Sequence, residues 1–340
     1  MKKALITGVS GQDGAFLAKL LLEKGYIVYG FVRSRLSCWR LQELKLLEKI
    51  NLLDLDFENT KELYENLDLI QPDEIYNLVA QSSVAKSFEN PLETIWIDGF
   101  WVSHILEWIR KNKRETRFFQ AGSGEIFGIS KTFPQTEETP LSPNNPYSTA
   151  KVFAHNLVKN YRELYGIFAV NGILFNHDSE LRGINFFTRK VSNHIAGYFL
   201  GKKSILEVGN INVERDIGYA KEYVEAMYLS LQVDNPSDYV IATGTSQSIK
   251  NFITECFKVI HIDLIWQTNL TYQSGLDVST GEVLVKVNPS YFRHFEIPKQ
   301  LGDPTKAKQI LGWKAKTTLS ELAKIMVEYD IKFLSNQNIF

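Results

Sequence analysis

A tyrosine and a lysine four residues apart, Tyr147 and Lys151, stand at the start of a predicted helix. This spacing places both side chains on one face of the helix. A lysine ammonium beside a phenol favours the phenolate and lowers the pKa of the phenol, so the tyrosine can serve as a base near neutral pH. The spacing also occurs by chance in ordinary surface helices. The elements around the pair therefore determine whether a catalytic role is indicated.

A carboxylate, Glu125, follows a strand-like run in the segment RFFQAGSGEIFG, residues 117–128. The apolar run predicts a buried strand that ends at this corner. A charge at such a corner is costly unless it is exposed, paired or used in chemistry. Taken alone, the heptapeptide 122–128 favours an exposed loop carboxylate.

A glycine-rich turn follows the first predicted strand, KALIT, and precedes a helical pattern. Its three glycines have GxxGxxG spacing, which permits a tight turn and close approach of the backbone to a pyrophosphate at the helix N-terminus. The position between strand and helix therefore predicts a dinucleotide site. The loop residues predicted to hold the cofactor are Gly8, Ser10, Gly11, Gln12, Asp13 and Gly14.

The second predicted strand ends in two basic residues, Arg33 and Arg35. Folds of this kind that prefer NAD place Asp or Glu here for the ribose 2′-hydroxyl, whereas a 2′-phosphate needs cationic donors. The sequence thus favours NADP over NAD. The alternative is that both arginines are solvated surface residues.

Strands alternate with helical patterns as far as Phe175, which is typical of a doubly wound parallel sheet of the Rossmann type. We expect an α/β fold with an NADP-binding domain over residues 1–175, joined by about 211–245. Residues 176–210 and about 246–340 predict a smaller, interleaved lobe that binds the substrate. Within that lobe, the Gly/Ser/Thr-rich stretch QSGLDVSTGE predicts a link.

Composition excludes several classes of function. The 340 residues have a formal net charge of −1, so no global field attracts nucleic acid or an anionic membrane. The longest apolar runs fall well short of the ~18 residues that a membrane-spanning helix needs, and the start is too polar for a signal peptide. Two cysteines without metal-ligand spacing, Cys38 and Cys256, predict a reducing cytoplasm.

Several blocks closely resemble one enzyme family, and the resemblance covers nearly the whole chain. The blocks are NLVAQSSV (77–84), TRFFQAGSGEIFG (116–128), GILFNHDSELRG (172–183), FFTRK (186–190), ERDIGYAKEYVEAM (214–227) and LGDPTKAK (301–308). They are similar to the GDP-mannose 4,6-dehydratases, which are extended short-chain dehydrogenases/reductases that use NADP.

The resemblance implies a catalytic set and two binding sets. The catalytic set is Ser123, Glu125, Tyr147 and Lys151. The cofactor set adds Asp56, Phe57, Leu78, Ala80, Gln81, Ser82, His177 and Arg182 to the glycine loop, Arg33, Arg35, Tyr147 and Lys151. The sugar-nucleotide set is Asn176, Asn185, Lys190, Arg215, Arg293 and Glu296. The three cations of this last set suit a diphosphate, although each also fits an ordinary surface cation.

The resemblance implies a catalytic role for Glu125. Oxidation of the sugar C4 hydroxyl to a ketone acidifies the C5 proton, which a carboxylate can remove while the C6 hydroxyl leaves as water. A nucleotide-sugar epimerase or reductase needs no base at this corner, and a non-catalytic NADP sensor needs none of the four catalytic groups. Glu125 is therefore the residue that separates these alternatives.

The chain departs from the family pattern at a few positions. Glycines flank Ser123, Asn144 replaces an arginine before the catalytic tyrosine, Ile217 replaces a tryptophan, and residues 293–296 read RHFE. These positions are expected near the sugar and the diphosphate. A seven-carbon sugar, GDP-manno-heptose, is the alternative substrate that they leave open.

A predicted helix at about 95–111 carries more apolar residues than one inward stripe can hold, among them Trp96, Phe100, Trp101 and Trp108. The helix is therefore either fully buried or covered by a partner. The resemblance implies that this helix and the Tyr147 helix pair across a two-fold axis. We expect a homodimer, and the short loop after Arg33 leaves a tetramer open.

Overall fold

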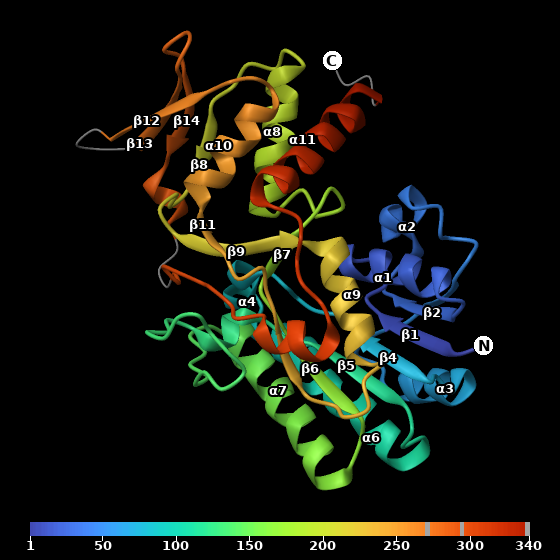
Figure 1. The fold of residues 1–340 in the computed structure, drawn as a ribbon. Coiled ribbons are helices and arrows are strands. Elements are labelled where there is room, and N and C mark those ends of the chain that lie inside the picture. Colours follow the sequence, from blue (N-terminus) through green and yellow to red (C-terminus); the bar gives the residue numbers. More distant parts are fainter. Residues whose placement is uncertain (269–272, 293–295, 337–340) are drawn as a thin grey trace. The chain divides into compact units, whose positions relative to one another are not determined.

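A computed structural model describes residues 1–268, 273–292 and 296–336. The chain divides into two compact units (Figure 1). The first comprises Met1–Phe175, Ala220–Thr243 and Gly302–Ala315, and the second Asn176–Tyr219, Gly244–Leu301 and Lys316–Phe340. These ranges differ from the predicted ones in two places: residues 302–315 lie in the first unit, and residues 211–219 lie in the second. What each unit binds remains a prediction.

A seven-stranded sheet forms the centre of the first unit. Its strand order is β10-β6-β5-β4-β1-β2-β3, and every neighbouring pair is parallel. The strands are β1 (Lys3–Thr7), β2 (Ile27–Val32), β3 (Asn51–Asp54), β4 (Glu74–Asn77), β5 (Arg117–Ala121), β6 (Ala169–Leu174) and β10 (Asp238–Ile241). The chain order reverses between β1 and β4, which is where such sheets bind their ligands. The predicted doubly wound parallel sheet is confirmed.

Helices cover the sheet in two layers (Figure 1). One layer holds α1 (Gln12–Glu23), which packs against α9 (Ala220–Ser230). The other holds α3 (Thr60–Ile70), α6 (Trp101–Asn112) and α7 (Pro146–Tyr165). Short helical segments connect these elements: η1 (Arg35–Ser37), α2 (Trp39–Glu43), α4 (Val84–Glu89), α5 (Pro91–Ile95), η2 (Trp96–Phe100), η3 (Gly124–Phe127) and η5 (Ala307–Leu311).

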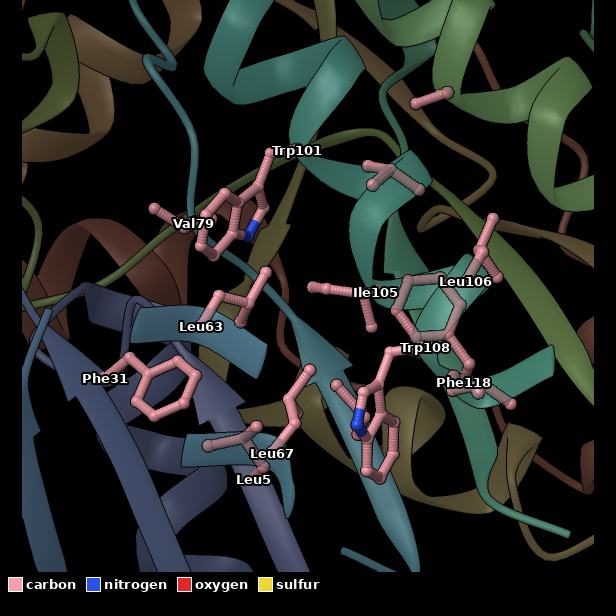
Figure 2. Close-up of a cluster of buried hydrophobic side chains, with 14 of the residues drawn as sticks. Leu5, Phe31, Leu63, Leu67, Val79, Trp101, Ile105, Leu106, Trp108 and Phe118 are labelled. Carbon is pink, nitrogen blue, oxygen red and sulfur yellow. The ribbon is translucent and has the colours of Figure 1, made fainter. Parts of the chain in front are cut away.

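Two of the aromatic residues of α6 pack into the hydrophobic core beneath that helix. Figure 2 shows the indoles of Trp101 and Trp108 pointing into a cluster with Leu63 of α3 and Phe118 of β5. Both tryptophans are almost completely buried within the protomer, so a partner is not needed to cover them. The predicted continuous helix is interrupted by the π-helical turn η2, and Phe100 in that turn remains 48% exposed.

The second unit contains two smaller sheets. The first has the order β11-β9-β7 and the second β12-β13-β14-β8. The strands are β7 (Asn176–Asp178), β8 (Leu206–Val208), β9 (Glu214–Tyr219), β11 (Ser246–Ser248), β12 (Leu264–Thr268), β13 (Gln273–Asp277) and β14 (Val283–Val287). The predicted link over 273–282 is wrong, because its first half is strand β13 and its second half is the turn into β14.

Three α-helices and a short 3₁₀ helix complete the described part of the second unit: α8 (Phe187–Phe199), α10 (Ile249–Val259), η4 (Pro289–Tyr291) and α11 (Leu319–Asn336). A buried ion pair joins α8 to α11, with Arg189 Nη2 2.6 Å from Asp330 Oδ1. Ser192 adds a hydrogen bond to the same carboxylate. Across the part of the chain that the structure describes, no helix combines the length and apolar character needed to cross a membrane.

Candidate active site

The glycine loop is packed so closely that side chains cannot replace its glycines. Gly8 has φ +71°, and a Cβ there would lie 2.9 Å from the Val79 backbone after β4. A Cβ on Gly14 would lie 2.4 Å from the Gly8 carbonyl oxygen. Gly11 donates its N–H to that same oxygen at 2.9 Å and forms the N-cap of α1. The loop therefore joins the C-terminal ends of β1 and β4 to a helix N-terminus, as a pyrophosphate site requires.

The segment after β4 is fastened to β1 and carries the next group of predicted cofactor residues. The backbone N–H groups of Leu78 and Val79 donate to Thr7 Oγ1 at 3.1 and 3.2 Å. Gln81 donates its side-chain amide to the Ser83 carbonyl at 2.9 Å. Leu78, Ala80 and Gln81 are half-buried and Ser82 is exposed. The segment is therefore held in place by hydrogen bonds but remains accessible to a ligand.

Both predicted 2′-phosphate ligands are engaged by carboxylates. Arg33 lies 3.3 Å from Glu93, and Arg35 lies 3.0 Å from Asp54 and donates to the Leu52 carbonyl. More than half of each arginine side chain is exposed. Exposed ion pairs of this kind contribute only about 0.2–1 kcal/mol, so a phosphate can displace the carboxylates.

Asp56 and Phe57 follow β3 and differ in exposure. Asp56 is exposed and accepts a hydrogen bond from the Glu58 N–H. Phe57 is buried against Trp101, with ring centroids 5.1 Å apart, and the Arg33 guanidinium lies 5.9 Å from its ring. Phe57 thus connects the predicted adenine side of the site to the core.

The corner after β5 holds Ser123 and Glu125 in a short 3₁₀ turn, η3. Ser123 is buried and its Oγ accepts a hydrogen bond from the Glu125 N–H at 3.2 Å. Glu125 is half-buried. The turn ends at Gly128, which has φ +54° and whose added Cβ would lie 1.8 Å from the Ser142 carbonyl oxygen. This close packing fixes the corner between β5 and the loop that leads to α7.

Helix α7 positions Tyr147 and Lys151 in its first two turns. Its N-terminus is a capping box: the Asn145 side chain accepts from the Ser148 N–H at 2.8 Å, and Ser148 Oγ accepts from the Asn145 N–H at 3.2 Å. Tyr147 is buried. Lys151 Nζ lies 5.7 Å from the centroid of the Tyr147 ring, within the range of a cation–π contact.

The side chain of Lys151 is buried and contacts the C-terminal end of β5. Its Nζ donates to the carbonyl of Ala121 at 3.0 Å, and Ala121 precedes Ser123 by two residues. Burial lowers the pKa of Lys151, and the carboxylate of Asp98 at 3.7 Å opposes that effect. The structure therefore brings the predicted Tyr–Lys pair together and places it on the helix that packs against η3.

The second unit holds the remaining predicted residues. Arg182 pairs with Asp178 at 3.1 Å, Lys190 Nζ donates to the Glu207 carbonyl at 3.3 Å, and Arg215 Nη1 donates to the Ile297 carbonyl at 2.7 Å. Asn176 and Asn185 are exposed, whereas His177 and Glu296 are half-buried. Arg293 lies outside the residues that the structure describes.

Two residues near the predicted set were missed by sequence reasoning. Arg40 of α2 donates to the Ser10 carbonyl at 3.0 Å, which places a cation against the glycine loop. Asp98 is the buried partner of Lys151. A polar residue inside the apolar run TIWIDGFWV was the only signal for Asp98, and nothing in the local pattern indicated Arg40.

Comparisons with known proteins identify relatives that match nearly the whole chain. A family model described as GDP-mannose 4,6 dehydratase matches residues 5–326. The GDP-mannose 4,6-dehydratase of Sinorhizobium fredii is 42% identical over 98% of this chain and 97% of its own length. The human GDP-mannose 4,6 dehydratase is 40% identical over 97% of this chain and 92% of its own length.

Solved structures share the fold at low sequence identity. The UDP-glucose 4-epimerase of Thermotoga maritima matches with a TM-score of 0.80 and 21% identity, covering 98% of this chain and 99% of that chain. The dTDP-glucose 4,6-dehydratase of Bacillus anthracis matches with a TM-score of 0.79 and 17% identity, covering 100% and 99%. These likenesses support the fold, and the family follows from the relatives of higher identity. The chain belongs to the GDP-mannose 4,6-dehydratase family.

Proposed function

We propose that this protein converts GDP-mannose to GDP-4-keto-6-deoxymannose with loss of one water, using NADP. The observation that carries the proposal is the corner after β5, where Ser123 and Glu125 lie in a turn that packs against the helix of Tyr147 and Lys151. The 40–42% identity to named GDP-mannose 4,6-dehydratases along nearly the whole chain supports the same activity. A carboxylate in a turn that packs against the helix of the Tyr–Lys pair favours a dehydratase over an epimerase.

Tyr147 and Lys151 begin the reaction in this proposal. NADP, when bound, supplies the acceptor for the hydride from C4 and later returns that hydride to C6. Tyr147 takes the proton of the C4 hydroxyl, and Ser123 donates a hydrogen bond to the same oxygen. Lys151 holds the phenolate by its charge and contacts the ribose of the cofactor. Each proton-transfer group of this kind typically contributes about 10²–10⁴-fold in rate.

Glu125 performs the step that defines a dehydratase. Once C4 is a ketone, Glu125 removes the C5 proton, the C–O bond at C6 breaks, and the hydroxyl leaves as water with that proton. C6 would receive the hydride that left C4, C5 would take a proton from solvent, and Tyr147 would release to solvent the proton that it took from the C4 hydroxyl. Overall the sugar loses one water and undergoes no net oxidation.

The cofactor proposal is supported by the first unit's loops and cations. The glycine loop of residues 8–14 and the segment after β4 meet at the reversal of strand order, and their close packing leaves backbone N–H groups at the N-terminus of α1. Arg33 and Arg35 favour the 2′-phosphate of NADP over the 2′-hydroxyl of NAD. His177 and Arg182 are proposed for the nicotinamide side.

The second unit supplies the proposed GDP-sugar ligands Asn176, Asn185, Lys190, Arg215, Arg293 and Glu296. Lys190 and Arg215 are the described cations of this set, and both are oriented by hydrogen bonds to backbone carbonyls. Cations held in this way suit a diphosphate, because less side-chain entropy is lost on binding.

We further propose a homodimer and a cytoplasmic location. An aromatic ladder of Trp96, Phe100 and Phe153 crosses η2 and α7, with centroid separations of 6.2 and 5.5 Å. Phe100 and Phe153 are nearly half exposed, which is unusual for adjacent stacked phenylalanines on a surface without a partner. Both cysteines are buried free thiols, which fits a reducing compartment.

Incubation with two substrates tests the function. Pure protein with NADP is mixed separately with GDP-mannose and with GDP-manno-heptose, and the nucleotide sugars are analysed by mass. We expect loss of one water from GDP-mannose. Loss of water from the heptose alone would make that sugar the substrate, and loss from neither would refute the dehydratase proposal.

A further inference from the structure

Asp98 is a buried carboxylate to which the proposed reaction gives no role. Its side chain is fully buried in the π-helical turn η2, between α5 and α6. A carboxylate in such surroundings is very costly when it is alone and is normally paired with a cation. A π-helical turn inside a longer helix also occurs frequently at functional sites.

The turn η2 faces the helix of the proposed catalytic pair. A Cβ on Gly99 would lie 3.3 Å from the Phe153 ring and 3.5 Å from the Ala150 carbonyl oxygen, so η2 and α7 approach closely. Phe100 stacks on Phe153 next to this contact. Gly99 thus permits an approach that brings the preceding residue, Asp98, within reach of Lys151.

Asp98 contacts two parts of the proposed site. Its Oδ1 lies 3.7 Å from Lys151 Nζ, an ion-pair distance that is too long for a hydrogen bond. The same oxygen accepts the Gln81 N–H at 3.1 Å, which fastens the segment after β4. Oδ2 has no hydrogen-bond partner among residues 1–268, 273–292 and 296–336.

The charges of Asp98 and Lys151 depend on each other. Burial raises the pKa of Asp98 to about 6, while the ammonium of Lys151 and, more weakly, the Arg33 guanidinium oppose this rise. Burial lowers the pKa of Lys151, and Asp98 is the charged group that opposes it. The phenol of Tyr147 is a further titratable group near Lys151, whose Nζ lies 5.7 Å from the centroid of the Tyr147 ring.

We propose that Asp98 is a positioning residue of the dehydratase. Its carboxylate keeps Lys151 charged and beside Tyr147, so that the phenol stays acidic enough to act as a base. Its hydrogen bond to Gln81 holds the cofactor segment in register with the same lysine. Asp98 itself exchanges no proton with the sugar. This inference rests on the roles proposed above for Tyr147 and Lys151.

Direct titration of Lys151 tests the charge of the pair without any substrate. Protein labelled with ¹³C at lysine Cε is titrated by NMR, and the Lys151 signal is assigned by its loss in Lys151→Met. Asp98→Asn keeps the acceptor for Gln81 but removes the charge. We expect Lys151 to lose its proton at least about one pH unit lower in this variant. Glu163→Gln, which removes an exposed charge from the same helix, should leave the titration unchanged.

The pH dependence of turnover gives a second readout. The basic limb of kcat/KM should move to lower pH in Asp98→Asn, because the lysine must remain protonated, so the loss of activity at pH 9 should exceed that at pH 7 about 10-fold. Asp98→Ala should show the same shift together with weaker cofactor binding. A variant that titrates and responds to pH like the wild type, or whose acid limb alone moves, would overturn the proposal.

These experiments distinguish failure of the proposed dehydratase function from failure of the proposed role of Asp98. If the wild-type protein released no water from GDP-mannose, the proposed function would fail, yet the Lys151 titration would still decide whether Asp98 maintains its charge. If the wild type were active and the Lys151 titration were the same in Asp98→Asn, the role of Asp98 would be refuted and the dehydratase would stand. Circular dichroism of each variant shows that the fold is retained.

Discussion

Arg33 and Arg35 are each paired with a carboxylate, Glu93 and Asp54. If Arg33 binds a 2′-phosphate, Arg33→Ala removes a charge-assisted contact of roughly 1.5–3 kcal/mol. NADP binding should then weaken by about 10- to 150-fold, with NAD binding little changed. Equilibrium titration of both cofactors measures this. Wild-type protein that binds NAD more tightly than NADP would contradict the assignment.

If Arg33 binds the 2′-phosphate, Glu93 competes with the cofactor for this arginine, because the two side chains form an ion pair. The Arg33–Glu93 pair is exposed and weak, so Glu93→Gln should strengthen NADP binding by about 1.5- to 5-fold, the factor that corresponds to 0.2–1 kcal/mol. NAD affinity should remain the same. Glu89→Gln on α4 removes an exposed carboxylate nearby and serves as the control. Equal gains for NADP and NAD would show that Glu93 does not act on the 2′-phosphate.

At the scale of elements, the corner after β5 depends on Gly128. A Cβ there would meet the Ser142 carbonyl at 1.8 Å in addition to the strain of φ +54°, so Gly128→Ala should destabilise the fold by about 3 kcal/mol or more. Gly166 ends α7 with φ +65° and open space around it, so Gly166→Ala should cost only about 1–2 kcal/mol. Urea unfolding measures both, and equal costs would contradict the packing argument.

The sequence predicted the elements whose pattern is locally consistent. The strands that end at Thr7 and Ala121 have short apolar runs, ALI and FF, and the helix of Tyr147 has both a capping residue and a regular apolar face, so these predictions were correct. The hairpin of β13 and β14 was missed because Gly275 and Ser274 lower strand propensity, while its pairing with β12 is a tertiary effect. The π-turn was missed because one inserted residue leaves the apolar pattern almost unchanged.

Local patterns also indicated part of the candidate site, whereas the residues that reach the site through tertiary contacts were missed. Tyr147 and Lys151 lie together on α7, as their spacing predicted. The roles that the resemblance gives to these two residues and to Ser123 and Glu125 remain predictions. Asp98 was not found, because its contact with Lys151 depends on the turn η2, and sequence spacing does not indicate that contact. The sequence left open whether Trp101 and Trp108 are buried in the protomer or covered by a partner, and the core of their own protomer buries them.

At the scale of the whole molecule, we expect the aromatic ladder of Trp96, Phe100 and Phe153 to lie in the interface of the proposed homodimer. Phe100→Glu together with Phe153→Glu should convert a dimer into a folded monomer, because the charges replace two exposed rings. Trp101→Glu should instead unfold the protomer, since Trp101 has no exposed surface. Light scattering with circular dichroism distinguishes these results. Phe199→Glu, at an exposed phenylalanine of α8, is the control, and a double variant that remains dimeric would exclude this surface.

The most direct test of the central claim is turnover of Glu125→Gln in D₂O. The wild type should place deuterium at C5, because the proton removed there is replaced from solvent. The variant keeps the shape but accepts no proton, so product formation should fall by about 10²–10⁴-fold. C4 oxidation should persist as absorbance of reduced nicotinamide, which Tyr147→Phe should abolish. Glu138→Gln, an exposed carboxylate in the following loop, should behave like the wild type. Turnover of Glu125→Gln at close to the wild-type rate would show that Glu125 is only a loop carboxylate and would favour an epimerase or reductase.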